Sequence, residues 1–486
     1  MGMQSKGHAI MIALPYQGHI NPYISLALKL ASKGFTITFV HLEFIHHKLS
    51  KAHHNGEVED FFSEARESGL DIRYATIGDG FPLEFDRDRK VQEYWEVMLR
   101  DFPGRVDEFV GKMIDQSQPC DVQYFLVTDT VYSWAAIIAD KYKLVNVSFF
   151  TEPALVFSLQ YHWDLLKERG HFPCKDKIED ITYVPGVDSI NTRDLMSTLR
   201  EHEPEDVVYK MLSQAFEEVK KADFILHNTV KDLESEALSA LNKYQPNYAV
   251  GPINFSKTLA PNTVSKSFWS ESDCTKWLES KSIGSVLYVS FGSLVHTNKQ
   301  IIEEMAYGLL LSEVNFIWVI RDGILESGDA NVLPVGYEDE IKDKGLIVPW
   351  CNQIEVLSNP TVGGFLTHNG WNSTVESMWC GVPMICYPVT YDQPTNRKLV
   401  VDDWKIGINL CDGESVNRFE VAERIKSFMS DGSISKSFKM KADKVKETMQ
   451  KALEIDGSSG RNFDRFIKDL EAKIHNKAAN VENLCK

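Results

Sequence analysis

The sequence lacks the patterns that mark membrane and secreted proteins. It has no apolar run of about 18 residues, which a membrane-spanning helix requires. Residues 1–15 contain only a short apolar run without the features of a signal peptide. The eight cysteines are scattered, and none forms a C-x-x-C pair. Scattered cysteines favour reduced thiols in a cytoplasmic protein over a disulfide framework or a zinc site.

The familiar nucleotide fingerprints are also missing. No G-x-G-x-x-G follows the first apolar segment, where residues 15–19 read PYQGH, and no G-x-x-x-x-G-K-[ST] loop occurs. These absences count against a dinucleotide-dependent dehydrogenase, the main alternative for an alternating strand and helix pattern, and against a nucleoside triphosphatase. The net charge of -17 and the lack of a basic stripe exclude a nucleic-acid-binding surface.

What is present is an alternation of apolar strands and helices in each half of the chain. The 486 residues are too many for one hydrophobic core, so the length indicates several domains. In the first half the pattern predicts strands at 9–14, 35–40, 125–128 and 145–150, with helices beginning at Asn21-Pro22 and near 134–139. In the second half it predicts strands at 285–291, 316–321, 346–349 and 362–367, and a helix at 301–311 opened by a Thr297–Gln300 capping box. A segment rich in Ser, Asn, Lys and Pro at 254–270 reads as the linker. The fold class is therefore α/β, with two Rossmann-like, doubly wound parallel sheets that would face a central cleft.

One short stretch, residues 367–383, combines many polar side chains with apolar flanks. It reads as the end of a buried strand, a turn at Gly370, and a helix that stops at Gly381 and Pro383. Ser373 and Glu376 have the spacing of a capping box, which alone could explain both residues. The alternative is that the polar cluster at this helix N-terminus binds an anion such as phosphate.

A 44-residue block from Trp350 to Gln393 makes the pattern specific. It closely resembles the signature box, or PSPG box, of plant secondary-product glycosyltransferases, which transfer sugar from a UDP-sugar to small lipophilic acceptors. Further landmarks of that family stand at residues 18–22, 128–129, 250–252 and 290–293, so the resemblance covers nearly the whole chain. It implies a GT-B fold: an acceptor-binding domain at 1–252, a linker and lead-in at 253–283, a UDP-sugar-binding domain at 284–457, and a C-terminal helix at 458–486 that packs back on the first domain.

The resemblance also assigns a role to each residue of the predicted donor site. Trp350 would stack on uracil, the backbone of Cys351 would read the edge of the base, and Gln353 and Glu376 would bind the ribose. The resemblance assigns binding of the diphosphate to Ser293, His368, Asn372 and Ser373. It assigns binding of the sugar hydroxyls to the Trp371 backbone, Asp392 and Gln393. In the family, Gln at the position of Gln393 goes with glucose, so UDP-glucose is the expected co-substrate.

His19 and Asp129 are the predicted catalytic pair, because strand ends distant in sequence can lie side by side in a parallel sheet. His19 would take the acceptor proton and Asp129 would orient its ring in an inverting displacement. For Asp129 a plain turn aspartate is the competing interpretation. No metal and no resident cofactor are expected, since no D-x-D stands at a strand end beside the box. A nucleotide-sugar-binding protein without turnover is a further alternative, which the presence of both residues disfavours.

The resemblance implies that the acceptor is a small lipophilic molecule: a flavonoid, another phenolic, a terpenoid or a steroid. Its pocket is expected in segments 80–95 and 190–202, and both oxygen and carbon remain open as the site of transfer. The aromatic residues Tyr16, Trp95 and Phe149 either line this pocket or pack in the core. We expect a monomer.

Overall fold

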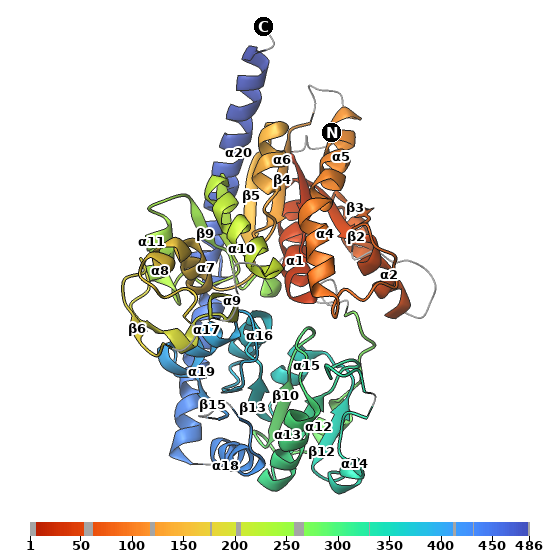
Figure 1. The fold of residues 1–486 in the computed structure, drawn as a ribbon, viewed down its shortest axis with the longest axis vertical. Helices are drawn as coiled ribbons and strands as arrows, with labels where there is room; N and C mark the ends of the chain where they lie inside the picture. The colour runs from red at the N-terminus through yellow and green to blue at the C-terminus, as the bar shows by residue number, and fades with distance from the viewer. Residues whose placement is uncertain are drawn as a thin grey trace. The chain divides into compact units, whose positions relative to one another are not determined.

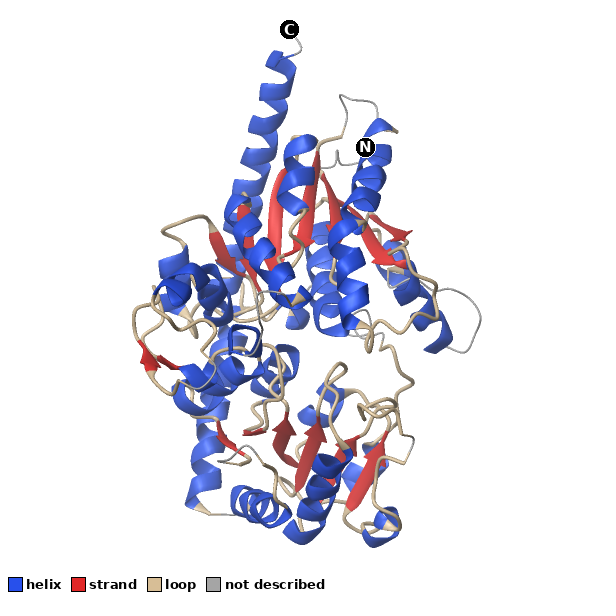
Figure 2. Ribbon diagram, viewed as in Figure 1, coloured by secondary structure: helices blue, strands red, loops and turns tan. Residues whose placement is uncertain are grey.

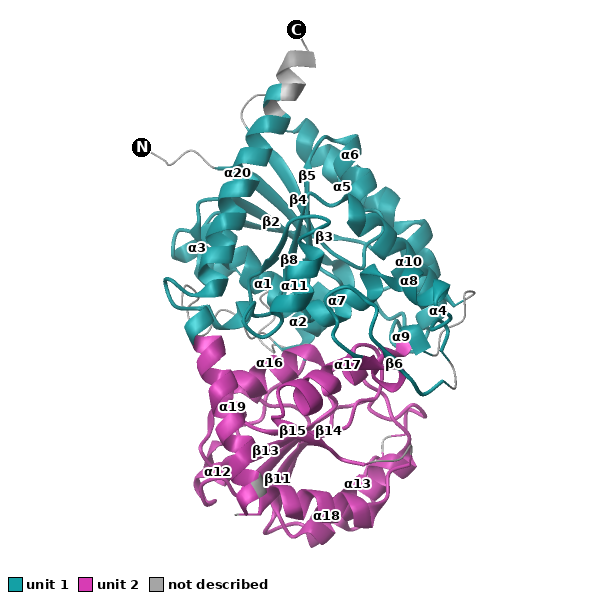
Figure 3. Ribbon diagram, turned by 90° about the vertical axis from the view of Figure 1, so that its left-hand side faces the viewer, with its two compact units in different colours: residues 1–189, 198–268, 451–486 teal, residues 190–197, 269–450 magenta. Residues whose placement is uncertain are grey.

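The computed structural model describes residues 6–52, 62–116, 122–174, 177–200, 206–256, 267–329, 331–411, 415–430 and 432–484. The chain divides into two compact units (Figure 3). Unit 1 comprises residues 1–189, 198–268 and 451–486, and unit 2 comprises residues 190–197 and 269–450. Most of the predicted linker, at 257–266, lies outside the described residues. No helix in the described part of the chain is both long and apolar enough to span a lipid bilayer.

Unit 1 is built on a seven-stranded sheet with the order β3-β2-β1-β4-β5-β8-β9, and its neighbouring strands pair in parallel (Figures 1 and 2). The strands are β1 (His8–Ile12), β2 (Thr36–Leu42), β3 (Ile72–Ile77), β4 (Tyr124–Asp129), β5 (Val145–Phe150), β8 (Phe224–His227) and β9 (Asn247–Ala249). Every residue of β1 and β2 is buried, as expected for parallel strands covered on both faces.

Helices cover both faces of this sheet (Figure 3). They are α1 (Gln17–Ser32), α2 (Glu43–Ala52), α3 (Ser63–Glu67), α4 (Val91–Arg100), α5 (Phe102–Asp115), α6 (Ala135–Lys141), α7 (Ala154–Tyr161), α8 (Trp163–Glu168), α10 (Val207–Glu218), α11 (Ser235–Leu241) and α20 (Ser458–Leu484). The last of these, α20, inserts Phe463 and Phe466 into the core, and its Asp469 accepts a hydrogen bond of 2.6 Å from Tyr248. The end of the chain is thus part of unit 1.

Unit 2 has a six-stranded parallel sheet with the order β12-β11-β10-β13-β14-β15. Its strands are β10 (Val286–Ser290), β11 (Asn315–Val319), β12 (Gly345–Val348), β13 (Val362–Thr367), β14 (Met384–Cys386) and β15 (Gly407–Asn409). Its helices are α12 (Thr275–Glu279), α13 (Lys299–Ser312), α14 (Tyr337–Glu340), α15 (Gln353–Ser358), α16 (Trp371–Cys380), α17 (Gln393–Lys398), α18 (Arg418–Met429) and most of α19 (Ser433–Ala452). The predicted pair of doubly wound parallel sheets is confirmed.

The predicted helix starts were less accurate than the strands. The first helix begins at Gln17, because the carbonyl of Tyr16 accepts from the backbone N–H groups of His19 and Ile20, so Asn21 is not its cap. In unit 2, the capping interpretation of Thr297 is wrong: the cap of α13 is Asn298, whose side chain accepts from the N–H of Ile301 at 2.9 Å. At the predicted stop of α16, Gly381 does adopt the left-handed conformation, with φ of 70°.

Candidate active site

Unit 1 brings His19 and Asp129 into direct contact. Asp129 is the last residue of β4, and His19 lies in the first turn of the helix that follows β1. Because β1 and β4 are hydrogen-bonded neighbours, the turn after one strand reaches the end of the other. His19 Nδ1 lies 2.8 Å from Asp129 Oδ2, and the side chains are 17% and 1% exposed. Asp129 also accepts from the N–H of Val131, so it serves the turn as well as the histidine.

The contact with Asp129 fixes which nitrogen of His19 carries the proton. An ionised carboxylate only accepts hydrogen bonds, so Nδ1–H must be the donor in the neutral ring. The lone pair is then on Nε2, where it can accept a proton. Thr151 holds its Oγ1 3.1 Å from the same Nδ1 and is buried. Thr151 lies in the loop after β5 and is a contact of His19 that the sequence did not reveal.

One of the three candidate pocket aromatics, Tyr16, lies near His19. Tyr16 has its ring centroid 6.5 Å from that of His19 and 6.3 Å from that of Trp95. Phe149 is fully buried in the core of unit 1 and packs against Tyr23. Tyr16 is thus the aromatic residue beside His19, whereas Trp95 is 5% exposed and belongs, like Phe149, to the core of unit 1.

In unit 2, His368 directly follows β13 and is closely packed against two glycines. A Cβ added at Gly292 or Gly370 would come within 2.5 or 2.4 Å of its Nε2, so glycine is required at both places. Gly292 also has a φ of +73°, which favours glycine independently. Burial lowers the pKa of His368 to about 4, with a smaller contribution from the nearby charge of Arg321. Within the described residues its Nδ1 has no hydrogen-bond partner.

Gln353, Ser373 and Glu376 form one hydrogen-bonded group. The Gln353 amide donates to Ser373 Oγ at 3.0 Å and to Glu376 Oε2 at 2.5 Å. The capping interpretation of Ser373 and Glu376 is wrong: α16 begins two residues earlier, at Trp371, and its N-cap is Gly370. The carboxylate of Glu376 instead accepts the hydrogen bond from the side-chain amide of Gln353 in α15. Desolvation raises the pKa of Glu376 to about 7, although the bond from Gln353 opposes the shift.

Trp350 and Cys351 stand in the loop before α15. The Trp350 indole stacks on Trp269, with centroids 4.4 Å apart and an interplanar angle of 26°. One face of Trp350 is thus covered by protein, and a base could stack only on the other. Cys351 is buried, and its Sγ lies 3.6 Å from the hydroxyl of Tyr288. No local pattern predicts the role of Trp269, which lies 81 positions before its partner.

Asp392 and Gln393 are held at the start of α17. Asp392 Oδ2 accepts from the Asn396 amide at 2.5 Å. The oxygen of Gln393 accepts from the N–H groups of Val389 and Thr390, each at 2.9 Å. That oxygen is therefore committed to the protein, and the NH₂ group is what Gln393 offers to a ligand.

The other predicted donor-site residues lie at the same edge of the sheet. Ser293 is in the turn after β10, and Trp371 and Asn372 open α16. Arg321 holds the loop of Ser293 by donating to the carbonyl of Val295. Since β10 and β13 are neighbours, all of these residues gather at the carboxyl ends of two adjacent strands.

The acidic side chains of the predicted sites are engaged by protein partners, not by each other. Asp129 contacts His19, Glu376 contacts Gln353, and Asp392 contacts Asn396. Over the described residues, no group of three or more His, Cys, Asp or Glu side chains is arranged to hold a metal ion.

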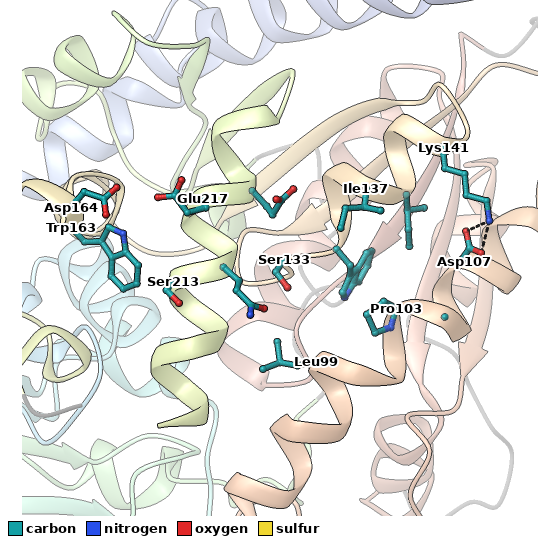
Figure 4. Close-up of a pocket in the computed structure, with 15 residues that line it drawn as sticks. Leu99, Pro103, Asp107, Ser133, Ile137, Lys141, Trp163, Asp164, Ser213 and Glu217 are labelled. Atoms are coloured by element: carbon teal, nitrogen blue, oxygen red, sulfur yellow. Dashed lines mark hydrogen bonds and ion pairs between the residues drawn. The ribbon is translucent and has the colours of Figure 1, made fainter. Parts of the chain in front are cut away.

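A separate cavity of about 880 Å³ opens on unit 1 among helices α4, α5, α6, α8 and α10 (Figure 4). Its lining includes Leu99, Pro103, Trp134 and Trp163, and at one edge Lys141 pairs with Asp107 at 2.6 Å. Its described lining residues include none of the predicted site residues.

Comparison with known proteins agrees with these features. Residues 112–445 match the family model of UDP-glucoronosyl and UDP-glucosyl transferases. The chain is 48% identical to UDP-glycosyltransferase 86A1 of Arabidopsis thaliana, over 99% of this chain and 97% of that protein. It is 35% identical to a 7-deoxyloganetin glucosyltransferase of Catharanthus roseus, over 96% of this chain and 97% of that protein.

The fold is shared with solved members as well. The structure of Phytolacca americana UGT2 complexed with UDP-2-fluoro-glucose and pterostilbene superposes with a TM-score of 0.76 at 26% identity, covering 96% of this chain and 99% of the other. With two parallel-sheet units, a family match over most of its length and relatives matched nearly end to end, the chain belongs to the UDP-glycosyltransferase family and is a glycosyltransferase with the GT-B fold.

Proposed function

We propose that this enzyme transfers a hexose, glucose in the first place, from its UDP-sugar to a hydroxyl of a small lipophilic acceptor, with inversion at the anomeric carbon. The observation that carries the proposal is the contact between His19 and Asp129, which leaves Nε2 of His19 as a proton acceptor. A protein that only stores nucleotide sugar has no use for such a pair.

In the proposed reaction the acceptor oxygen attacks the anomeric carbon from the face opposite UDP. Its proton passes to His19 Nε2, and Asp129 stabilises the imidazolium that forms. The bond between the anomeric carbon and the diphosphate oxygen breaks, and UDP leaves with the electron pair. No resident cofactor or metal has a step in this scheme.

The developing charge on UDP is assigned to Ser293, His368, Asn372 and Ser373 and to the N-terminus of α16. Backbone N–H groups at a helix N-terminus favour anions, and α16 has ten residues. With a pKa of about 4, His368 is neutral near pH 7 and contributes a hydrogen bond, not a full charge. The net charge of -17 makes these local dipoles more important for holding an anion.

The nucleoside and the sugar are assigned to the remaining residues of the polar edge. Uracil would stack on the uncovered face of Trp350, with its edge read by the Cys351 backbone. Ribose hydroxyls would meet Gln353 and Glu376, which already lie together. The sugar hydroxyls are assigned to the Trp371 backbone, Asp392 and Gln393. Asp392 supplies a carboxylate acceptor and Gln393 an amide donor.

The acceptor class is supported by the aromatic ring of Tyr16 near His19 and by the relatives. One relative is named for 7-deoxyloganetin, and one solved neighbour holds pterostilbene. We infer a phenolic or terpenoid alcohol. The test is a panel of such aglycones incubated with UDP-glucose and read by mass spectrometry for the added hexosyl group. Product with no member of the panel would count against the proposal.

We place this reaction in the cytoplasm, carried out by a monomer. The described cysteines, among them buried Cys174, Cys274, Cys351 and Cys386, are unpaired thiols, as a reducing compartment maintains them.

Replacing Trp350 with alanine is expected to weaken UDP binding by ~1–3 kcal/mol, the usual contribution of stacking between an aromatic side chain and a base. Isothermal titration calorimetry with UDP measures it. The control is Trp277→Ala, in α12 of the same unit but outside the predicted site. Unchanged affinity in a folded Trp350→Ala protein would refute the uracil assignment.

UDP affinity is also expected to depend on pH through Glu376. Ribose hydroxyls donate to an ionised carboxylate, and burial raises the pKa of Glu376 to about 7. Affinity should therefore rise as pH increases through this value, and fall below it by at most about tenfold per pH unit. The UDP dissociation constant is measured between about pH 6 and pH 8 for native protein and Glu376→Gln, and the comparison cancels the titration of UDP itself. If both proteins give the same pH profile, Glu376 does not bind the ribose.

A further inference from the structure

A short segment from the first half of the chain is built into unit 2. Residues 190–197 belong to that unit, although residues 189 and 198 belong to unit 1 (Figure 3). The segment comprises β7 (Ile190–Asn191), a 3₁₀ turn (Thr192–Asp194) and the first residue of α9 (Ser197–Arg200). It lies within segment 190–202, a predicted part of the acceptor pocket. Two of its residues, Asp194 and Ser197, contact the loop and helix around Gln393.

Ser197 forms hydrogen bonds with the backbone of Tyr391, the residue directly before Asp392 and Gln393. The N–H of Ser197 donates to the carbonyl of Tyr391 at 2.9 Å, and the N–H of Tyr391 donates to Ser197 Oγ at 2.7 Å. The same hydroxyl lies 3.2 Å from Thr390 Oγ1. Ser197 is 2% exposed, so these bonds are shielded from water.

Tyr391 needs such support because its φ is +58°, in the left-handed region. A bulky residue other than glycine adopts this conformation only where neighbouring contacts impose it, at a cost of about 1 kcal/mol or more. The two hydrogen bonds from Ser197 are contacts of that kind. Without them the loop would be free to relax.

A second set of contacts holds α17, the helix that carries Gln393. Asp194 pairs with Arg397 in α17, and both side chains are largely buried at 12% and 13% exposure. The carbonyl of Asp194 also accepts from Thr395 Oγ1 at 2.7 Å. Burial raises the pKa of Asp194, whereas the charge of Arg397 opposes the shift.

The loop held by Ser197 also aims Gln393. The amide oxygen of Gln393 accepts from the N–H groups of Val389 and Thr390, so a movement of that loop rotates the NH₂ group. We propose that Ser197, supported by Asp194, is a positioning residue that sets the donor-sugar specificity of the enzyme by holding Tyr391 in its left-handed conformation. This inference rests on the proposed assignment of Asp392 and Gln393 to the sugar.

The test compares native protein with Ser197→Ala and Ser197→Thr. In Ser197→Ala, kcat/KM for UDP-glucose should fall roughly tenfold, in line with the loss of buried hydrogen bonds, and the ratio of kcat/KM for UDP-glucose over UDP-galactose should move toward one. The affinity for UDP, which has no sugar, should stay within about twofold, and Ser197→Thr, which keeps the hydroxyl, should restore most of the ratio. Ser280→Ala is the control, since its hydroxyl caps an exposed turn of unit 2 away from the site.

A second change separates positioning from a general loss of packing. Asparagine tolerates positive φ better than tyrosine, so adding Tyr391→Asn to Ser197→Ala should recover part of the lost selectivity. Unchanged donor kinetics in Ser197→Ala would overturn the inference, and so would an equal loss of UDP and UDP-glucose affinity. If native protein binds UDP-glucose yet transfers it to no acceptor, the proposed function fails; the ratio of binding constants for UDP-glucose and UDP-galactose then tests the role of Ser197 by itself.

Discussion

Replacing His19 with alanine is expected to lower kcat by about 10²–10⁴ while UDP affinity stays unchanged, because a positioned general base typically contributes that much to a rate. His19 Nδ1 is fixed by Asp129 at 2.8 Å and by Thr151 at 3.1 Å, which leaves Nε2 to accept the acceptor proton. His19 lies in unit 1 and the residues proposed to bind uracil and diphosphate lie in unit 2, so nucleotide binding should not depend on it. The measurement is steady-state kinetics with UDP calorimetry alongside.

The acidity of the acceptor sharpens this test. A phenol loses its proton easily, whereas an aliphatic alcohol needs the base, so the loss in His19→Ala should be larger on the alcohol. Asp129→Asn should cost less than His19→Ala on a phenol, because the ring is still present. Near-full activity of His19→Ala on an aliphatic alcohol would show that the base lies elsewhere.

The second large effect concerns a buried ion pair in the loop after β3. Arg87 and Asp79 are 5% and 3% exposed, and Arg87 donates to the two carboxylate oxygens at 2.7 and 3.1 Å. Its guanidinium also donates to the carbonyls of Phe85 and Pro82 and lies 4.0 Å from the ring centre of Phe44. Replacing Arg87 with methionine should therefore lower the free energy of unfolding by ~3–5 kcal/mol, because it strands the charge of Asp79 in the interior.

Urea unfolding followed by circular dichroism measures this effect. Arg100→Met is the matched control, since Arg100 pairs with Asp101 on the surface and its loss should change the midpoint little. The double variant Arg87→Met, Asp79→Leu should be more stable than Arg87→Met alone, because no charge remains unpaired. A midpoint of Arg87→Met equal to that of native protein would contradict the assigned role of the pair.

Central strands were predictable from the sequence because parallel strands buried on both faces are apolar throughout. The strands β3, β8, β9, β14 and β15 were not predicted; β3, for example, lies at the sheet edge and exposes Arg73 and Thr76. The predicted strand at 145–150 coincides with β5 (Val145–Phe150), and that at 362–367 with β13 (Val362–Thr367). Helix starts were not predictable, since a polar residue such as Asn21, the fifth residue of α1, has the same local pattern inside a helix as at a cap. Only the hydrogen bonds to Tyr16 distinguish the two.

The residues of the candidate site also form two groups, those that the sequence predicted and those that it did not. Residues in one contiguous block, such as Gln353 and Glu376, were found because the block as a whole is recognisable. Thr151, Trp269 and Ser197 were missed because each acts on a residue between 81 and 194 positions away, through contacts that no local pattern encodes. Their partners became visible only once the sheets set which strand ends are neighbours.

The most direct test of the central claim is the configuration of the product. UDP-glucose carries an α linkage, so a single displacement with His19 as base must give a β-glucoside. Proton NMR of the product from one accepted phenol or alcohol reads the anomeric coupling constant. We expect the large coupling of a β-glucoside, and an α-linked product would contradict the proposed mechanism.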